Sequence, residues 1–223
     1  MKDIVTLGEL LIDFTPCGQQ DGQQVFMQNP GGAPANVVVA ASNFGMDTAY
    51  LGMVGDDTFG RYLAGVLESR GVDVSGMKYS QDVHTTLAFV HLFPNGDRDF
   101  SFYRKPGADI MYSMDDLDVD MIKNTRVFHF GAVSLTDEPV RSAMFKALEI
   151  AKLAGVTVSY DPNYRAPLWK SADEAKKYML EGMKYADLLK LSDNEVQFLF
   201  GDMDMEEAAR MLVKRGAKLA FVT

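Results

Sequence analysis

Residues 29–36 read Asn-Pro-Gly-Gly-Ala-Pro-Ala-Asn, and the apolar run Val-Val-Val-Ala-Ala follows directly at residues 37–41. Two adjacent glycines allow a bend that residues with a Cβ atom make only with strain. Pro34 fits the first turn of a helix, where its missing N–H is not needed. The stretch predicts a helix start at which bare backbone and the Asn36 amide face a small polar molecule. A plain turn before a packed helix would have the same sequence, so the rest of the chain must decide between the two.

Outward from this stretch, short apolar runs alternate with helical patterns. Glycines such as Gly155 and Gly216 stand where helices are expected to end. The predicted strands are residues 4–7, 49–54, 126–130, 157–160, 187–191 and 218–223, and the predicted helices are residues 34–44, 58–69, 138–154, 172–183 and 206–215. This alternation predicts βαβ units and a mostly parallel sheet with helices on both faces, an α/β fold.

Two segments interrupt the alternation. Residues 14–28 are polar and rich in glutamine, and residues 85–103 hold two β-rich runs on either side of Asn95-Gly96. An Asn-Gly pair between two such runs predicts a hairpin. We expect one α/β domain over residues 1–223, with lid segments at about 14–30 and 84–105 that form a small antiparallel sheet over a site. A plain extension of the sheet edge is the alternative.

Composition and charge argue against several classes of protein. The net charge of −9 is not interrupted by a cluster of Lys or Arg, so a nucleic-acid partner is not expected. No apolar run approaches the ~18 residues of a membrane span. The single cysteine, Cys17, cannot form an internal disulfide, which fits a cytoplasmic protein. The three histidines lack the spacing of a metal-ligand pair, and His129 is interpreted as a buried strand residue.

Absent motifs are also informative. The chain has no Gly-x-x-x-x-Gly-Lys-Ser/Thr loop and no Gly-x-Gly-x-x-Gly after a predicted strand. It also lacks a Gly-x-Ser-x-Gly elbow. These absences disfavour a P-loop NTPase, a dinucleotide-dependent oxidoreductase and a serine hydrolase.

Polar residues follow several of the predicted strands. Asp13 comes shortly after the first strand, residues 161–165 (Asp-Pro-Asn-Tyr-Arg) follow the strand at 157–160, and residues 192–195 (Ser-Asp-Asn-Glu) follow the strand at 187–191. Because parallel strands end at one edge of their sheet, these residues are expected to outline one crevice. A carboxylate there can accept hydrogen bonds from sugar hydroxyls, and Arg165 suits a phosphate. Helix capping is the alternative explanation for the acidic residues.

In this order, the motifs resemble the ribokinase/PfkB family of carbohydrate kinases, and the match runs from Gly8 to Thr223. Residues 96–109 (Gly-Asp-Arg-Asp-Phe-Ser-Phe-Tyr-Arg-Lys-Pro-Gly-Ala-Asp) resemble the fructokinase branch in particular. The resemblance implies a three-layer α/β/α body with a β lid that covers the sugar and pairs with a second subunit in a homodimer. It also implies ATP, Mg²⁺ and a monovalent-cation site for K⁺.

The resemblance also implies roles for individual residues. The sugar would be held by Asp13, Gly31, Gly32 and Asn36, with Arg104 and Arg165 reaching the sugar or the transferred phosphate. The nucleotide would lie near Asn163, Ser192 and Thr223, and Glu195 would bind Mg²⁺ through water. Ser192 departs from the asparagine that some relatives carry three residues before that glutamate.

The family's second signature, Asp-Thr-x-Gly-Ala-Gly-Asp, does not occur in residues 1–223. It supplies the aspartate base and follows a strand that ends like Phe221-Val222-Thr223. We therefore expect the base and most of the adenine pocket beyond Thr223. By this expectation the chain is roughly the first two-thirds of a kinase and is inactive by itself. Asp13 is a poor candidate for the base because it would anchor the sugar.

The resulting hypothesis is an ATP-dependent kinase that phosphorylates a hydroxyl of a small sugar, with fructose as the substrate. Three substrates of the same family remain open: 2-keto-3-deoxygluconate, ribose and a nucleoside. A sugar-binding fragment or regulator without turnover is the alternative from another class. A Rossmann-type oxidoreductase is the last alternative, and it lacks its glycine fingerprint here.

Overall fold

The computed structural model describes residues 1–93 and 98–223. Its main sheet has seven strands in the order β11-β10-β9-β8-β1-β4-β5, and every neighbouring pair is parallel. The strands are β1 (Lys2–Leu7), β4 (Thr48–Gly55), β5 (Met77–Ser80), β8 (Thr125–Phe130), β9 (Thr157–Tyr160), β10 (Leu188–Leu191) and β11 (Leu219–Val222). The predicted α/β class is thereby confirmed, although β5 was missed because its sequence, Met-Lys-Tyr-Ser, lacks the continuous apolar run by which the other strands were recognised.

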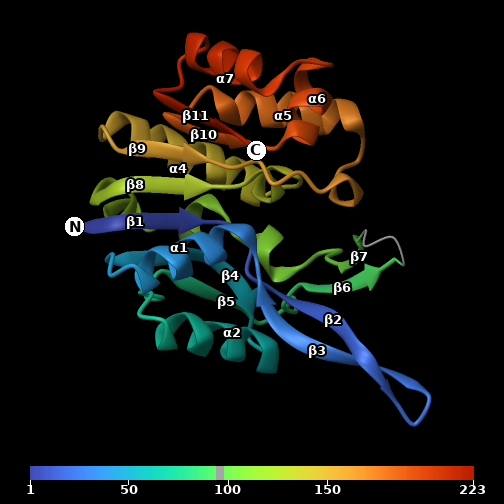
Figure 1. Cartoon of the computed structure of the whole chain (residues 1–223). Helices are drawn as coiled ribbons and strands as arrows, with labels where there is room; N and C mark the ends of the chain where they lie inside the picture. The colour runs from blue at the N-terminus through green and yellow to red at the C-terminus, as the bar shows by residue number, and fades with distance from the viewer. Residues whose placement is uncertain (94–97) are drawn as a thin grey trace.

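Helices cover both faces of this sheet (Figure 1). The α-helices are α1 (Ala33–Asn43), α2 (Thr58–Ser69), α3 (Val119–Lys123), α4 (Val140–Leu153), α5 (Ala172–Met183), α6 (Asp193–Phe200) and α7 (Met205–Lys214). The short 3₁₀ helices are η1 (Ala108–Met111), η2 (Met114–Asp116), η3 (Ala132–Leu135) and η4 (Ala166–Leu168). Among the described residues, no helix is both long and apolar enough to cross a bilayer.

Strand β4 shows why the two faces are both covered. Ala49, Leu51 and Met53 belong to the core cluster that includes α4 and α5, whereas Tyr50 and Val54 pack with α1 and α2. Successive side chains of a strand point to opposite faces, so a strand buried on both sides needs a continuous apolar run. The uninterrupted apolar character of the strand therefore predicted its position in the middle of three layers.

A second, smaller sheet projects from the side of the main sheet at which its strands have their carboxyl ends (Figure 1). Its strands are β2 (Leu11–Gln20), β3 (Gln23–Gly31), β6 (Leu87–Leu92) and β7 (Arg98–Tyr103), in the order β3-β2-β6-β7. The pairs β2–β3 and β6–β7 are antiparallel, but β2 and β6 run parallel. The expectation of a wholly antiparallel sheet was wrong, because β2 and β6 both leave the main body in the same direction. The predicted Asn95-Gly96 turn lies outside the described residues.

The register of the small sheet gives its two faces different characters. Asp13 lies opposite Ala88, which lies opposite Phe102, so these residues share the face that adjoins the main body. The other face carries an aromatic cluster in which the Phe89 ring contacts the rings of Phe14, Phe26 and Tyr103. One face of the small sheet therefore belongs to the site described next.

Candidate active site

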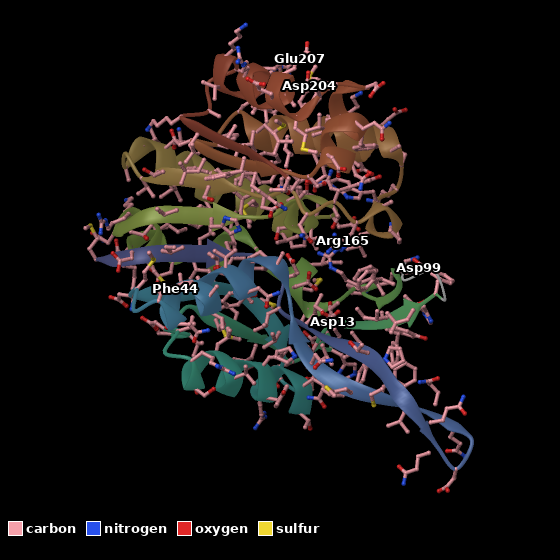
Figure 2. All side chains as sticks on the ribbon, viewed as in Figure 1. Asp13, Phe44, Asp99, Arg165, Asp204 and Glu207 are labelled. Atoms are coloured by element: carbon pink, nitrogen blue, oxygen red, sulfur yellow. The ribbon has the colours of Figure 1, made fainter. Side chains whose placement is uncertain are left out.

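A cavity of about 170 Å³ lies where the small sheet meets the ends of β1 and β9. Pockets for drug-sized ligands typically span ~300–1,000 Å³, so this one suits a small molecule. Its lining comes from Glu9, Leu11, Asp13, Gly32, Ala33, Asn36, Phe100, Phe102, Val133, Asn163, Arg165 and Leu168. Five residues predicted from the sequence thus meet in one place: Asp13, Gly32, Asn36, Asn163 and Arg165. Figure 2 shows Asp13 on the small sheet and Arg165 on the loop after β9, both near the junction of the two sheets.

The two glycines form the junction between β3 and α1. Gly32 precedes α1 with φ +114°, in the region that favours glycine. A Cβ atom on Gly32 would overlap the backbone carbonyl of Glu9, and one on Gly31 would overlap the Asp13 carboxylate. The pair is therefore more than a plain turn, because it lets the start of the helix approach two acidic segments closely.

Asp13 presents a half-buried carboxylate to the cavity. Its burial raises the pKa of the carboxyl, and the positive charge of Arg165 partly offsets this effect. Among the described residues, no hydrogen bond to its carboxylate oxygens occurs. A desolvated carboxylate without partners is suited to accept hydrogen bonds from the hydroxyl groups of a ligand.

Arg165 reaches the cavity from a tightly turned loop. Asn163 has φ +50°, and its N–H donates to the Asp161 carboxylate at 3.2 Å. Arg165 Nη1 donates to the Tyr164 carbonyl at 3.1 Å, and its guanidinium lies 5.6 Å from the centre of the Phe100 ring. The loop thereby places one positive charge opposite Asp13, beside an aromatic residue of the small sheet.

Arg104, which is expected to reach the sugar or the transferred phosphate, is buried at the base of β7. Its buried guanidinium donates from Nε to Asp109 at 2.7 Å, and from Nη1 to the hydroxyl of Thr136 at 2.8 Å. A third donor, Nη2, bonds the Val133 carbonyl at 3.2 Å. Arg104 does not line the cavity. The reason is local, because Asp109 lies five positions along the chain and neutralises the guanidinium at the base of β7.

Ser192 and Glu195 follow β10, Thr223 follows β11, and none of the three lines the cavity. Ser192 and Glu195 form a capping box at the start of α6. Glu195 accepts hydrogen bonds from the backbone N–H of Ser192 and of Tyr164, both at 2.8 Å. Thr223 exchanges backbone hydrogen bonds with Leu191 and Asp193. These residues therefore join the loop after β9 to the start of α6.

A direct metal centre is not found in the part of the chain that the structure describes, because no group of three or more His, Cys, Asp or Glu side chains converges there. His129 agrees with its interpretation as a strand residue: it is buried on β8, its Nδ1 lies 3.0 Å from the Ser159 hydroxyl, and burial lowers its pKa to about 4.

Among the lining residues that were not selected from the sequence, Phe100, Phe102 and Glu9 are the most informative. Phe100 and Phe102 alternate with Asp99 and Ser101 on β7, and this period of two was a usable signal for a shared face. Glu9 lies just after the end of β1. The acidic residues that were selected from the sequence also lie just after strands, so the same signal could have identified Glu9. Burial raises the pKa of its carboxyl to about 7.

Comparisons with known proteins cover the whole chain. Residues 1–223 match the family described as pfkB family carbohydrate kinase. The chain is 44% identical over 226 residues to probable fructokinase-2 of Arabidopsis thaliana, covering 99% of this chain and 68% of that relative. The solved fructokinase of Xylella fastidiosa with bound ATP superposes with a TM-score of 0.87 at 33% identity, covering 100% of this chain and 72% of that one. The fructokinase of Vibrio cholerae O395 in its fructose, ADP and calcium ion bound form gives 0.89 at 33% identity, covering 100% and 70%.

Proposed function

This chain belongs to the pfkB family of carbohydrate kinases, and we propose that it acts as an ATP-dependent fructokinase, transferring the γ-phosphoryl group to a hydroxyl of fructose. One observation carries the proposal most directly. Asp13, Gly32 and Asn36 line a small cavity beneath the second sheet, in a fold shared with a fructokinase solved with fructose and ADP.

On the sugar side, we assign hydroxyl recognition to Asp13, Asn36 and the backbone at Gly31 and Gly32. Asp13 accepts from hydroxyls, and the Asn36 amide both donates and accepts. The small sheet, residues 14–30 and 84–105, acts as a lid whose Phe100 and Phe102 side chains keep water from the sugar. Water exclusion matters because water competes with the sugar as a phosphoryl acceptor.

On the phosphate side, ATP supplies the phosphoryl group when bound. Arg165 offsets negative charge at the reacting group, since an arginine suits oxyanion contacts and such preorganised charge is the main source of catalysis in phosphoryl transfer. Asn163, Ser192 and Thr223 are assigned to the nucleotide side. Asp13 is not assigned as the base, because it anchors the sugar.

The metal assignment is Mg²⁺ near Glu195, with K⁺ as a second cation implied by the family. Both Glu195 oxygens accept backbone hydrogen bonds in this structure, from Ser192 and Tyr164. Such a carboxylate fits contact with Mg²⁺ through bound water, which Mg²⁺ retains in most protein sites.

We further propose a cytoplasmic homodimer that pairs through the small sheet. Within the described part of the small sheet, Phe26 and Tyr103 lie on the face that carries the aromatic cluster, and both are exposed. Both rings contact Phe89 in that cluster, and exposed apolar groups that lie together mark interaction surfaces. The exposed free thiol of Cys17 fits a reducing compartment.

The test combines sugar binding by this chain with a coupled assay of ATP-dependent phosphorylation by the protein purified from its natural source. We expect fructose to bind and react in preference to ribose, 2-keto-3-deoxygluconate and nucleosides. Asp13→Asn and Asn36→Ala should each raise the fructose Kd or KM about tenfold or more, because each removes polar contacts to the sugar hydroxyls. Asp21→Asn is the matched control, since Asp21 is exposed in the β2–β3 turn.

Three outcomes would redirect the assignment. Unchanged fructose kinetics in Asp13→Asn would remove Asp13 from the sugar site. Tighter binding of 2-keto-3-deoxygluconate would make an acid sugar the substrate, with Arg165 as the partner of its carboxylate. Sugar binding without phosphorylation by the natural protein would instead favour a regulator.

A further inference from the structure

Glu9 has an unusual environment for a carboxyl group. It lies between β1 and β2 with only 4% of its surface exposed. Its Oε1 accepts a hydrogen bond of 2.9 Å from the backbone N–H of Ala33, the first residue of α1. Its Oε2 is buried and has no partner among the described residues. A charged carboxylate in this position would be half satisfied, which is unfavourable in a buried site.

The charges around Glu9 do not compensate for this burial. Asp109 of η1 and Arg104 face it, but their side chains form an ion pair with each other at 2.7 Å. Tyr50 of β4 also lies near, yet its hydroxyl donates to the carbonyl of Gly8. Asp13 and Arg165 line the same cavity. Burial is the largest influence on Glu9 and raises its pKa to about 7, so the carboxyl exchanges its proton near neutral pH.

The contact joins two residues that line the cavity, Glu9 and Ala33. It joins the segment between β1 and β2 to the start of α1, beside the glycine pair that precedes the helix. The Asn36 N–H bonds the carbonyl of Gly32 at 3.0 Å in the same first turn. A neutral Glu9 keeps the acceptor for Ala33 without placing a buried charge beside it. A charged Glu9 must be solvated, and the space for water is the cavity itself.

We propose, building on the fructokinase function proposed above, that Glu9 is a positioning residue that holds the Gly31–Gly32 junction in its protonated form, and that fructose binding is coupled to proton uptake at this carboxyl. A sugar under the closed small sheet displaces the remaining water from the cavity. The loss of water disfavours the charged form further, so the complex takes a proton from the buffer. By linkage, affinity for fructose falls as the pH rises through 7.

The experiment is calorimetric titration of fructose at pH 6.0 to 8.5 in buffers of different ionisation enthalpy, which counts the protons exchanged. The wild-type chain should take up a fraction of a proton near pH 7.5, and its Kd should rise roughly fivefold to thirtyfold between pH 6 and 8.5. Glu9→Gln keeps an acceptor for Ala33 but cannot titrate, so it should show neither proton uptake nor this pH dependence. Glu68→Gln, an exposed change on α2, is the matched control and should behave as the wild type.

Binding without proton uptake, or uptake that persists in Glu9→Gln, would overturn the inference. Absence of fructose binding at every pH would refute the proposed function instead, and a ligand-free measurement then decides the protonation state of Glu9.

That measurement uses the stability of the protein. Between pH 5 and 7 the folded carboxyl retains a proton that the unfolded chain, with a glutamate pKa of 4.5, has released. The free energy of unfolding of the wild type should therefore fall from pH 5 to 7 relative to Glu9→Gln. A constant difference between the two proteins would overturn the inference without any ligand.

Discussion

At the scale of single residues, Arg104 shows how a buried charged side chain is stabilised by its neighbours. The guanidinium is 3% exposed, as is the carboxylate of its partner Asp109. Thr86, directly before β6, donates to the other oxygen of the same carboxylate. The two strands of the β6–β7 pair are therefore held at their base by one buried ion pair, which makes Arg104 an anchor of the small sheet.

The first prediction concerns this anchor. Arg104→Met should lower the free energy of unfolding by ~3–5 kcal/mol, because it leaves Asp109 charged and buried without its partner. Urea unfolding monitored by circular dichroism measures the change. Arg126→Met is the matched control, since its ion pair with Asp3 is largely exposed and should contribute little. If Arg104→Met retained full stability but lost fructose affinity, Arg104 would contact the ligand after all.

The residues of the site differ in how far the sequence could place them. Asp13, Asn163 and Arg165 each follow a strand, and parallel topology brings the ends of such strands together. Arg104 and Glu9 could not be placed in this way, because the environment of a buried charge depends on neighbours in space. Arg104 is neutralised by Asp109, and the desolvation of Glu9 comes from several segments packed around it.

At the scale of elements, the start of α6 supports the cavity from outside. Glu195 closes the capping box with Ser192 and also binds the backbone of Tyr164, next to Arg165. The helix cap and the loop that carries the cavity's positive charge thus share one side chain.

The second prediction separates these two effects. Ser192→Ala should lower stability by ~1 kcal/mol, as expected for loss of an N-cap. Ser171→Ala, which removes the equivalent cap of α5, should have a similar effect on stability. Only Ser192→Ala should accelerate amide hydrogen exchange at residues 163–165. Equal exchange in both variants would show that the cap does not support the loop.

Helices could be predicted from the sequence where a helical pattern of apolar residues extends over several turns. The helices at 34–44 and 206–215 agree with α1 and α7 within one or two residues. The polar, glutamine-rich segment 14–28 shows no helical period and forms β2 and β3, whose stability comes from pairing with each other and with β6. The β2–β3 hairpin is local, and the Asp21-Gly22 pair at its turn was a usable signal, whereas the pairing of β2 with β6 joins residues far apart in the sequence, which local patterns do not reveal.

At the scale of the whole molecule, the order of the strands was beyond prediction. Alternating strands and helices predict the layers. They do not predict that β1 pairs with β4 on one side and with β8, a strand from much later in the sequence, on the other. The small sheet then leaves the body directly after β1, and its outer face carries aromatic side chains. That face supports the proposed dimer.

The third prediction tests this dimer. Light scattering should give twice the 24.7 kDa mass of one chain. Tyr103→Glu should reduce it to the mass of one chain, because Tyr103 is 67% exposed in the aromatic cluster and a charge there would be buried by pairing. Tyr62→Glu, an exposed position on α2, should leave the mass unchanged. A single-chain mass for the wild type would refute the dimer.

The hairpin of β2 and β3 is fixed at both ends beside the cavity, at Asp13 and at Gly31, and it carries the only cysteine of the sequence at an exposed position. A swing of the hairpin must therefore turn about the residues assigned to the sugar. A thiol-reactive fluorophore on Cys17 is then a built-in reporter. A change in its emission on addition of fructose would report closure of the hairpin in solution, and no residue has to be replaced to attach it.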